Sequence, residues 1–203
     1  MTVNLMIIDN PNLNKALESR LGHIPRKNEY PKWDKLLDWF MQSAPPSTHV
    51  SLPCLFANIR SNEVGKIQQQ EWLQIMVNTG YRVFTKPKAQ ETDDIDDQMV
   101  QQIWYHMDKE RRRTSLSRLV VISHDAKNFF KPLTEVKHLL PDIQITVLGL
   151  TGDAGPLERS TDFDFMDLRD IPGLIDFELP NSIVNLDDLP EHGKWFVPVS
   201  HKR

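Results

Sequence analysis

Short apolar runs alternate with longer amphipathic segments from the N-terminus to Gly149, and this alternation constrains the fold more than any other feature. The runs do not alternate between apolar and polar residues, so they are typical of strands buried on both faces. The clearest run is Leu119–Ser123, which reads Leu-Val-Val-Ile-Ser. Strands separated by helices of about ten or more residues predict a parallel sheet that is covered by helices on both sides.

The periodicity places each element approximately. We expect strands over residues 3–8, 49–57, 81–84, 119–123 and 143–148. We expect helices over residues 32–42, 66–78, 93–109 and 129–140, where apolar residues recur at helical spacing. Residues 14–31 show no clear period, so we predict a loop with at most a helical turn there.

The composition changes after Gly149. Residues 151–190 contain ten Asp or Glu against two Lys or Arg, and four prolines. We therefore predict one α/β domain over residues 1–150, with residues 151–203 as an acidic C-terminal extension that packs on it. Within this extension, Phe163–Leu168 could form a short edge strand, and we expect Trp195–Val197 to dock on the domain because burial of these rings is favourable.

Charge and cysteine content narrow the classes of function. The net charge is −4 and the pI is about 6.0, so the whole chain does not attract nucleic acid or an anionic membrane. Cys54 is the only cysteine, which excludes an intrachain disulfide and suits the reducing cytoplasm. No run approaches ~20 apolar residues, so we expect no membrane span. A homodimer is compatible with a domain of this size, although no motif indicates one.

Polar side chains gather where the predicted strands end. In an open parallel sheet the ligand site lies beyond the carboxyl ends of the strands. The residues that fall there are Asp9, Asn10, Asn12, Asn58, Arg60, Lys86, Lys88, Asp93, Asp94, Asp96, Asp97, Ser123, Asp125, Asn128, Thr151 and Asp153. Carboxylates brought together in this way repel one another unless a cation lies between them. Mg²⁺ or Mn²⁺ takes oxygen ligands, and the bound ion activates water against phosphodiesters, so the pattern predicts a metal-dependent nuclease.

The order of these motifs resembles the NYN domains, a family of PIN-like nucleases. The resemblance runs from Val3 to Leu168 and rests on several short segments in the same order. These are Ile8–Leu13, Gly80–Val83, Lys88, the acidic Asp93–Asp97, Val120–Asp125 with its Ser-His-Asp, Pro132-Leu133 and Asp164–Leu168.

The resemblance implies a fold, an activity and a set of site residues. The fold would be a PIN-like, Rossmann-like α/β/α sandwich with a five-stranded, mostly parallel sheet, and the activity an endoribonuclease that uses Mg²⁺ or Mn²⁺. Asp9, Asp125 and one of Asp96 and Asp97 would be metal ligands, with Asp9, Asp97 and Asp125 as the catalytic set. RNA would contact Asn12, Lys88, Ser123, Lys127 and Asn128.

Two positions depart from the family's pattern. The family usually has a further aspartate two residues after the one matched by Asp125, and Lys127 stands there instead. Asn128 could take its place, although an amide oxygen is a weaker ligand than a carboxylate. His124 replaces a small glycine. These departures favour an alternative function, a catalytically inactive PIN-like module that binds RNA or protein.

Simpler interpretations exist for several of the same residues. Asp9, Asp125 and the acids at 93–97 could only cap turns and helices, with Asp93 favoured as an N-cap. Adjacent Ser123, His124 and Asp125 do not suit a catalytic triad, because neighbours on an extended chain point in opposite directions. The basic residues 109–113 fit a solvated helix end better than an RNA surface, and Lys86, Lys88, Lys127 and Lys131 are better candidates for phosphate contacts.

Other functional classes receive less support. The histidines show no zinc-ligand spacing, and Cys54 lies in an expected buried strand. A phosphatase would need a second aspartate two residues after Asp9, which is missing. No glycine-rich phosphate loop is present, which argues against an NTPase or a dinucleotide enzyme.

Overall fold

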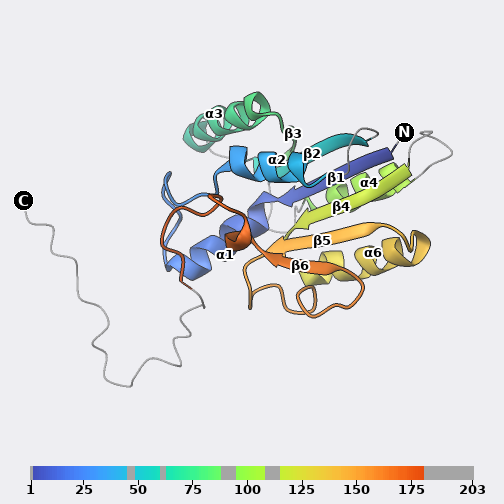
Figure 1. The fold of residues 1–203 in the computed structure, drawn as a ribbon. Helices are drawn as coiled ribbons and strands as arrows, with labels where there is room; N and C mark the ends of the chain where they lie inside the picture. Colours follow the sequence, from blue (N-terminus) through green and yellow to red (C-terminus); the bar gives the residue numbers. More distant parts are fainter. Residues whose placement is uncertain (1, 45–48, 60–62, 88–94, 108–114, 181–203) are drawn as a thin grey trace, which may run out of the picture.

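The protein forms a parallel sheet of six strands in the order β3-β2-β1-β4-β5-β6 (Figure 1). The structure is a computed structural model and describes residues 2–44, 49–59, 63–87, 95–107 and 115–180. All five neighbouring strand pairs in this sheet are parallel. The strands are β1 (Thr2–Asp9), β2 (His49–Ile59), β3 (Arg82–Pro87), β4 (Ser115–Ile122), β5 (Gln144–Gly149) and β6 (Asp164–Asp167).

Helices cover both faces of the sheet and make three layers. One face is covered by α1 (Asn10–Leu21), α2 (Trp33–Gln42) and α3 (Glu63–Thr79), and the other by α4 (Asp96–Met107) and α6 (Ala126–Leu139). A short 3₁₀ helix, η1 (Leu168–Asp170), follows β6. The predicted α/β/α sandwich is therefore confirmed.

Alternate residues of the central strands belong to two different cores. In β1, Leu5 and Ile7 pack with α4 and α6, whereas Met6 and Ile8 pack with α1 and α2. Both faces of these strands are buried, which is why the strands read as continuous apolar runs. The burial of these side chains supplies most of the stabilising free energy of the sheet.

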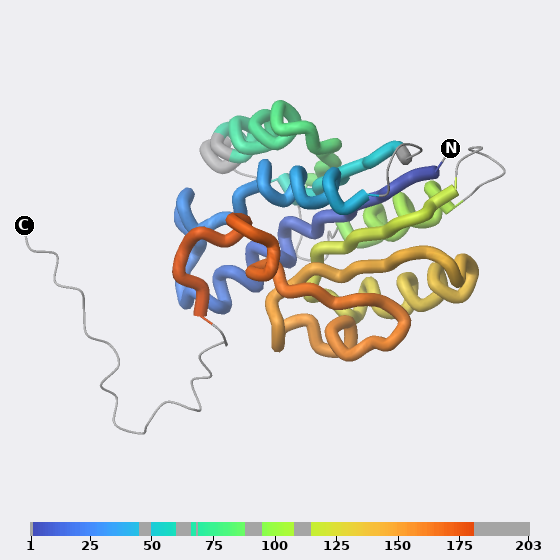
Figure 2. Tube along the Cα trace, in the orientation of Figure 1, coloured from blue at the N-terminus to red at the C-terminus, as the bar shows by residue number. Residues whose placement is uncertain are grey.

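The chain changes direction across the sheet between β1 and β4. It proceeds outward from β1 through β2 to β3, then returns to the other side of β1 and continues through β4, β5 and β6. In Figure 2 the blue β1 accordingly lies between the cyan-to-green β2 and the yellow-green β4. Such a point of reversal leaves a crevice beyond the carboxyl ends of the two central strands.

The structure corrects two predictions. The sheet has six strands and not five, because Asp164–Asp167 joins its edge beside β5, as expected for a short edge strand. Residues 14–31 contain more than a helical turn: residues 22–31 form the predicted loop, and α1 runs from Asn10 to Leu21. Its inward positions include Asn10 and the buried Arg20, so polar residues interrupt the apolar stripe that would have indicated a helix.

The remaining elements differ from prediction by a few residues at their ends. The predicted helix start at residues 93–94, the basic residues 109–113 and the apolar Trp195–Val197 lie outside the described residues. None of the helices in the described segments combines the length and the apolar character needed to cross a membrane.

Candidate acidic site at the carboxyl edge of the sheet

The site begins where the two central strands end side by side. Ile8 pairs with Ile122, so the next residues, Asp9 and Ser123, are neighbours at the point where the strand order reverses. The Ser123 hydroxyl donates a hydrogen bond of 2.9 Å to Oδ2 of Asp9. Both side chains are almost fully buried, with Asp9 only 2% exposed. A buried carboxylate must be hydrogen-bonded, and Ser123 meets part of that requirement.

Asp9 and Asp125 each cap the helix that follows a central strand. Asp9 Oδ1 accepts from the backbone N–H of Asn12 at 3.1 Å, and Asp125 Oδ1 accepts from that of Asn128 at 3.2 Å. The capping interpretation is therefore confirmed for both residues. It does not exhaust their bonding capacity, because each second carboxylate oxygen faces another polar group of the site.

A continuous set of hydrogen bonds links the acids of three elements. The Ser123 hydroxyl, which donates to Asp9, accepts from the backbone N–H of Asp125 at 3.0 Å. The amide nitrogen of Asn128 donates to Asp125 Oδ2 at 3.0 Å and also to Asp96 Oδ2. We call these five residues, Asp9, Asp96, Ser123, Asp125 and Asn128, the acidic network. It joins the ends of β1 and β4 to the N-termini of α4 and α6.

A shallow pocket opens from the network between α4 and α6. It has a volume of about 320 Å³ and is lined by Asp96, Asp97, Val100, Gln101, Asn128 and Pro132. Asp96 is buried, whereas Asp97 is exposed at its rim. Carboxylates on one side and apolar walls on the other give the pocket the mixed character of a ligand site.

His124 fixes Asn12 and the end of β5 to the network. Its ring Nε2 accepts a hydrogen bond of 2.7 Å from the backbone N–H of Leu150, so the proton of the neutral ring lies on Nδ1. Nδ1 then donates to Asn12 Oδ1 at 3.3 Å, and the same oxygen accepts from the His124 backbone N–H at 2.7 Å. Burial lowers the pKa of His124 to about 4; the smaller effect of Asp153 raises this pKa, and that of Arg20 lowers it further. This histidine is therefore neutral at pH 7, and its ring partners in the described parts of the chain are Asn12 and Leu150, not an acid as a triad would require.

Gly149 gives the His124 ring its space. A Cβ atom at this position would lie 3.2 Å from His124 Nε2 and 3.1 Å from Phe165 Cε2. Both distances are tighter than ordinary van der Waals contact. The small Gly149 therefore accommodates the His124 ring, and no residue spacing could predict this contact because the two positions are 25 residues apart.

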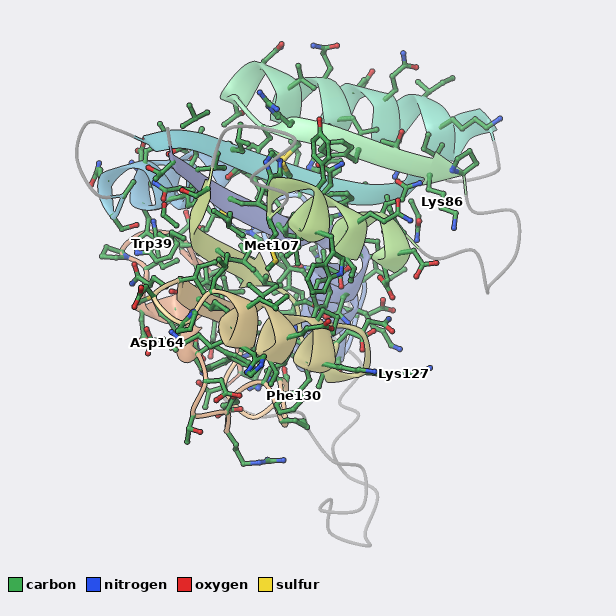
Figure 3. The ribbon with its side chains drawn as sticks, turned by 90° about the vertical axis from the view of Figure 1, so that its right-hand side faces the viewer. Trp39, Lys86, Met107, Lys127, Phe130 and Asp164 are labelled. Carbon is green, nitrogen blue, oxygen red and sulfur yellow. The ribbon has the colours of Figure 1, made fainter. Side chains whose placement is uncertain are left out.

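Lysines flank the acidic network at the same edge of the sheet. Lys86 lies at the end of β3 and Lys127 in the first turn of α6, and Figure 3 shows both at the end of the molecule toward which the strands point. Lys127 is exposed, and it is not among the residues that line the pocket. Lys88, the third lysine predicted here, lies outside the described residues.

Two predicted residues at the end of β5 belong to a separate structural cluster. Asp153 forms an ion pair with the buried Arg20, with 2.8 Å between Arg20 Nε and Asp153 Oδ2. The backbone N–H of Thr151 donates a hydrogen bond of 2.7 Å to Asp167 Oδ2. Burial would raise the pKa of Asp167, but hydrogen bonds from Arg169 and Thr151 outweigh it and lower that pKa well below its usual range. Sequence reasoning missed the Arg20 partner because a lone arginine in α1 carried no motif.

Two asparagines near the site have unmet hydrogen-bond capacity. Asn10 Oδ1 and Asn58 Oδ1 are buried and accept no hydrogen bond from any residue that the structure describes. Asn58 lies two residues beyond Phe56, the strand partner of Asp9, so its side chain leaves the sheet on the same face as Asp9. An oxygen that needs a donor at this position fits the binding of a polar ligand.

The oxygen atoms of the acidic network are of the kind that binds a divalent cation, but the carboxylates are not gathered closely around one point. Three carboxylates, at the end of β1, in the first turn of α4 and at the N-cap of α6, offer the oxygen ligands that Mg²⁺ and Mn²⁺ prefer. Ser123 and Asn128 space these acids apart, and in the described parts of the chain no three His, Cys, Asp or Glu side chains form a ready ligand group.

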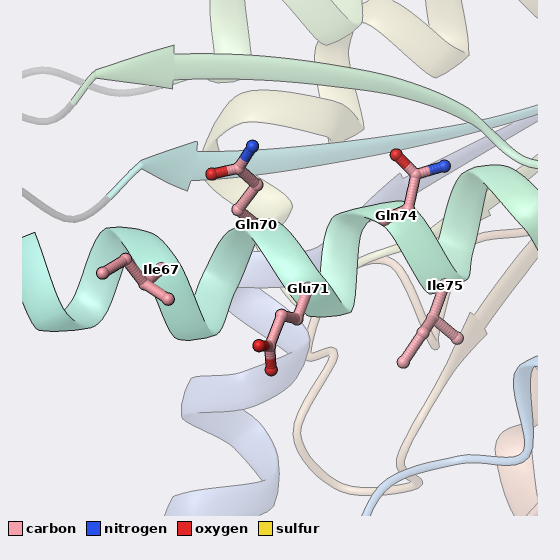
Figure 4. Close-up of a pocket in the computed structure, with 5 residues that line it drawn as sticks. All are labelled: Ile67, Gln70, Glu71, Gln74 and Ile75. Carbon is pink, nitrogen blue, oxygen red and sulfur yellow. The ribbon is translucent and has the colours of Figure 1, made fainter.

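A second hollow, of about 440 Å³, lies on the outer face of α3 (Figure 4). Its lining comes from this helix alone: Ile67, Gln70, Glu71, Gln74 and Ile75. It contains one acid and no cluster of reactive groups. The acidic network therefore remains the candidate site.

Neither a model of a known protein family nor a curated protein sequence matches this chain.

Proposed function

We propose that this protein is a metal-dependent endoribonuclease that hydrolyses RNA phosphodiester bonds at the acidic network. The observation that carries the proposal is the convergence of Asp9, Asp96 and Asp125 from three separate elements on the crevice between β1 and β4. Helix capping does not explain this convergence, because Asp9 and Asp125 would cap their helices equally well without the hydrogen bonds from Ser123 and Asn128. The resemblance to NYN domains supports the same activity.

Asp9, Asp125 and one of Asp96 and Asp97 would hold Mg²⁺ or Mn²⁺. When bound, the ion would lower the pKa of a water molecule and stabilise negative charge on the phosphodiester. Ser123 fixes the rotamer of the buried Asp9, and Asn128 fixes Asp96 and Asp125 relative to each other. Such preorganisation is what the chain itself contributes to the reaction.

The surrounding residues would position the RNA backbone. Asn12 Oδ1 is held by His124, which leaves the Asn12 amide nitrogen as a donor for a phosphate or a ribose hydroxyl. Lys86, Lys88 and Lys127 would attract the phosphates that flank the scissile bond. We place this activity in the cytoplasm, where the single buried Cys54 would stay reduced.

A second candidate function is a PIN-like module that binds RNA or protein without cleaving it. The observation that favours it is the position of Asn128, whose amide nitrogen donates to both Asp96 and Asp125. This amide already neutralises part of the repulsion between the two carboxylates, a task that the metal ion performs in a nuclease. Lys127 stands where the family usually has an acid, and this substitution also favours the binding module.

Cleavage of labelled RNA decides between the two candidates. Wild type and the variants Asp9→Asn, Asp125→Asn and Asp142→Asn would be incubated with single-stranded and structured RNA in Mn²⁺, Mg²⁺ or EDTA. Asp142 is exposed in the turn before β5, at the opposite edge of the sheet, and serves as the matched control.

The nuclease predicts metal-dependent cleavage that Asp9→Asn and Asp125→Asn abolish and Asp142→Asn preserves. An absence of cleavage by folded wild type over a broad RNA panel, together with unchanged RNA binding in all three variants, would refute the nuclease and favour the binding module. Cleavage that survives both site variants would place the active site elsewhere.

A further inference from the structure

The N-terminal half of α6 exposes two lysines and an aromatic ring beside the acidic network. Lys127 and Lys131 are exposed on successive turns, and Phe130, on the adjoining flank of the helix, is 37% exposed. Neither lysine forms an ion pair within the segments that the structure describes. Because the chain has a net charge of −4, an unpaired positive stripe next to an acidic site is a local departure from the overall charge.

Phe130 is held in place although it is partly exposed. Its ring packs edge-on against Phe163, with the centroids 6.1 Å apart and the planes at 70°. Phe163 is only 6% exposed, so it anchors the contact in the core. A ring held in this way loses little conformational entropy when a ligand stacks on it, which makes it a suitable binding platform.

Around the circumference of α6, the two lysines lie between the pocket and Phe130. Successive helical residues are rotated by about 100°. Asn128 and Pro132 line the pocket on one flank of the helix, Phe130 lies on the opposite flank, and the two lysines occupy the solvent-facing surface between them. Figure 3 shows Lys127 and Phe130 projecting into the open space around α6. The helix is about 10 Å across, a distance that one or two nucleotides can span.

We infer that this stripe, Lys127, Phe130 and Lys131, binds single-stranded nucleic acid as the strand leaves the acidic network, with Phe130 stacking on a base. Lysines that contact the backbone and an aromatic ring that contacts a base are the usual elements of a single-strand site without sequence preference. A duplex keeps its base faces covered by its own stacking, so it cannot use Phe130. The inference deepens the proposed ribonuclease function and rests on it for the path of the strand.

Glu135 sets the end of the stripe. It follows Lys131 by one helical turn and is exposed, so it would repel a phosphate placed directly beyond Lys131, although Lys137 and His138 occupy the last turn of the helix. The strand is therefore expected to cross the helix near its N-terminus and not to run along its length. This restricts the contact to the bases nearest the acidic network.

Binding of a short oligouridine with a fluorescent 2-aminopurine, measured in EDTA so that no cleavage occurs, tests the inference. Phe130→Ala is expected to weaken binding roughly 5- to 150-fold, the range found for one stacked base. Phe130→Leu keeps apolar contact with Phe163 but removes the aromatic face, so it should show a similar loss and a brighter 2-aminopurine signal. Leu139→Ala, which truncates another exposed apolar residue of α6, is the control and should bind as wild type does.

The lysines and the strand preference give independent readouts. The double variant Lys127→Ala with Lys131→Ala should reduce the slope of log affinity against log salt by about 1.4, since each single-strand phosphate contact contributes ~0.7. A hairpin duplex should bind more weakly than oligouridine and should not respond to Phe130→Ala.

Equal binding by wild type and Phe130→Leu, or no binding of oligouridine by wild type, would overturn the inference. Binding that depends on Phe130 in a protein that never cleaves RNA would refute the ribonuclease and leave the single-strand site standing. Cleavage that is lost in Asp9→Asn but unaffected by Phe130→Leu at limiting RNA would refute the single-strand site and support the ribonuclease.

Discussion

Protonation of His124 should destabilise the folded protein at mildly acidic pH. The neutral ring accepts a hydrogen bond from the Leu150 N–H through Nε2. A proton on that nitrogen would remove this hydrogen bond and place two N–H donors in repulsive contact. Burial lowers the pKa of His124 in the folded protein to about 4, against an ordinary 6.5 in the unfolded chain. The unfolded chain therefore binds this proton at a higher pH than the folded protein does. Stability is fully present above pH 6.5 and is lost as the pH falls from 6.5 toward 4.

The size of this effect follows from the two pKa values. Each pH unit between them contributes about 1.4 kcal/mol, so the full contribution is roughly 3 kcal/mol. Between pH 7 and pH 5 the free energy of unfolding should decrease by about 2 kcal/mol because of His124 alone.

Urea denaturation of wild type and His124→Gln at pH 7 and pH 5 measures this contribution. The glutamine variant cannot titrate, so its decrease between the two pH values should be about 2 kcal/mol smaller than that of wild type. His138→Gln removes an exposed histidine near the other end of α6 and should leave the wild-type decrease unchanged. Equal decreases in wild type and His124→Gln would refute the hydrogen-bonded neutral His124.

Three further predictions concern packing and reactivity. Gly149→Ala should cost about 1–3 kcal/mol of stability, and it should also reduce the pH dependence assigned to His124, as denaturation at pH 7 and pH 5 would show. Arg20→Met leaves the buried Asp153 without its partner and should cost about 3–5 kcal/mol; adding Asp153→Leu should recover part of this loss in the same assay. Cys54 should not react with a thiol reagent at pH 8 until the protein unfolds, because burial raises its pKa to about 12; rapid labelling of the native protein would contradict this.

The sequence was sufficient for the sheet because its signal is local. Runs such as Leu119–Ile122 are apolar at every position, and burial on both faces of the sheet is the simplest explanation of such a run. It was insufficient for α1, whose stripe contains Arg20 in an inward position. Arg20 is buried because Asp153 and the carbonyls of Thr151 and Pro180 accept its hydrogen bonds, and none of these partners is near it in sequence.

The sequence predicted those parts of the candidate site that follow from strand order, but not those that depend on contacts between distant residues. Asp9, Ser123 and Asp125 follow directly from the ends of adjacent strands, which parallel topology brings together. The links made by His124 and Asn128 depend on side-chain rotamers across three elements, and no residue spacing encodes them.

Calorimetric titration with Mn²⁺ tests most directly the central claim, that Asp9 and Asp125 are ligands of a divalent cation. Wild type and Asp142→Asn should each bind the ion with the same affinity, whereas Asp9→Asn and Asp125→Asn should lose binding while remaining folded by circular dichroism. Undiminished Mn²⁺ binding in both site variants, or no binding by wild type, would contradict the claim.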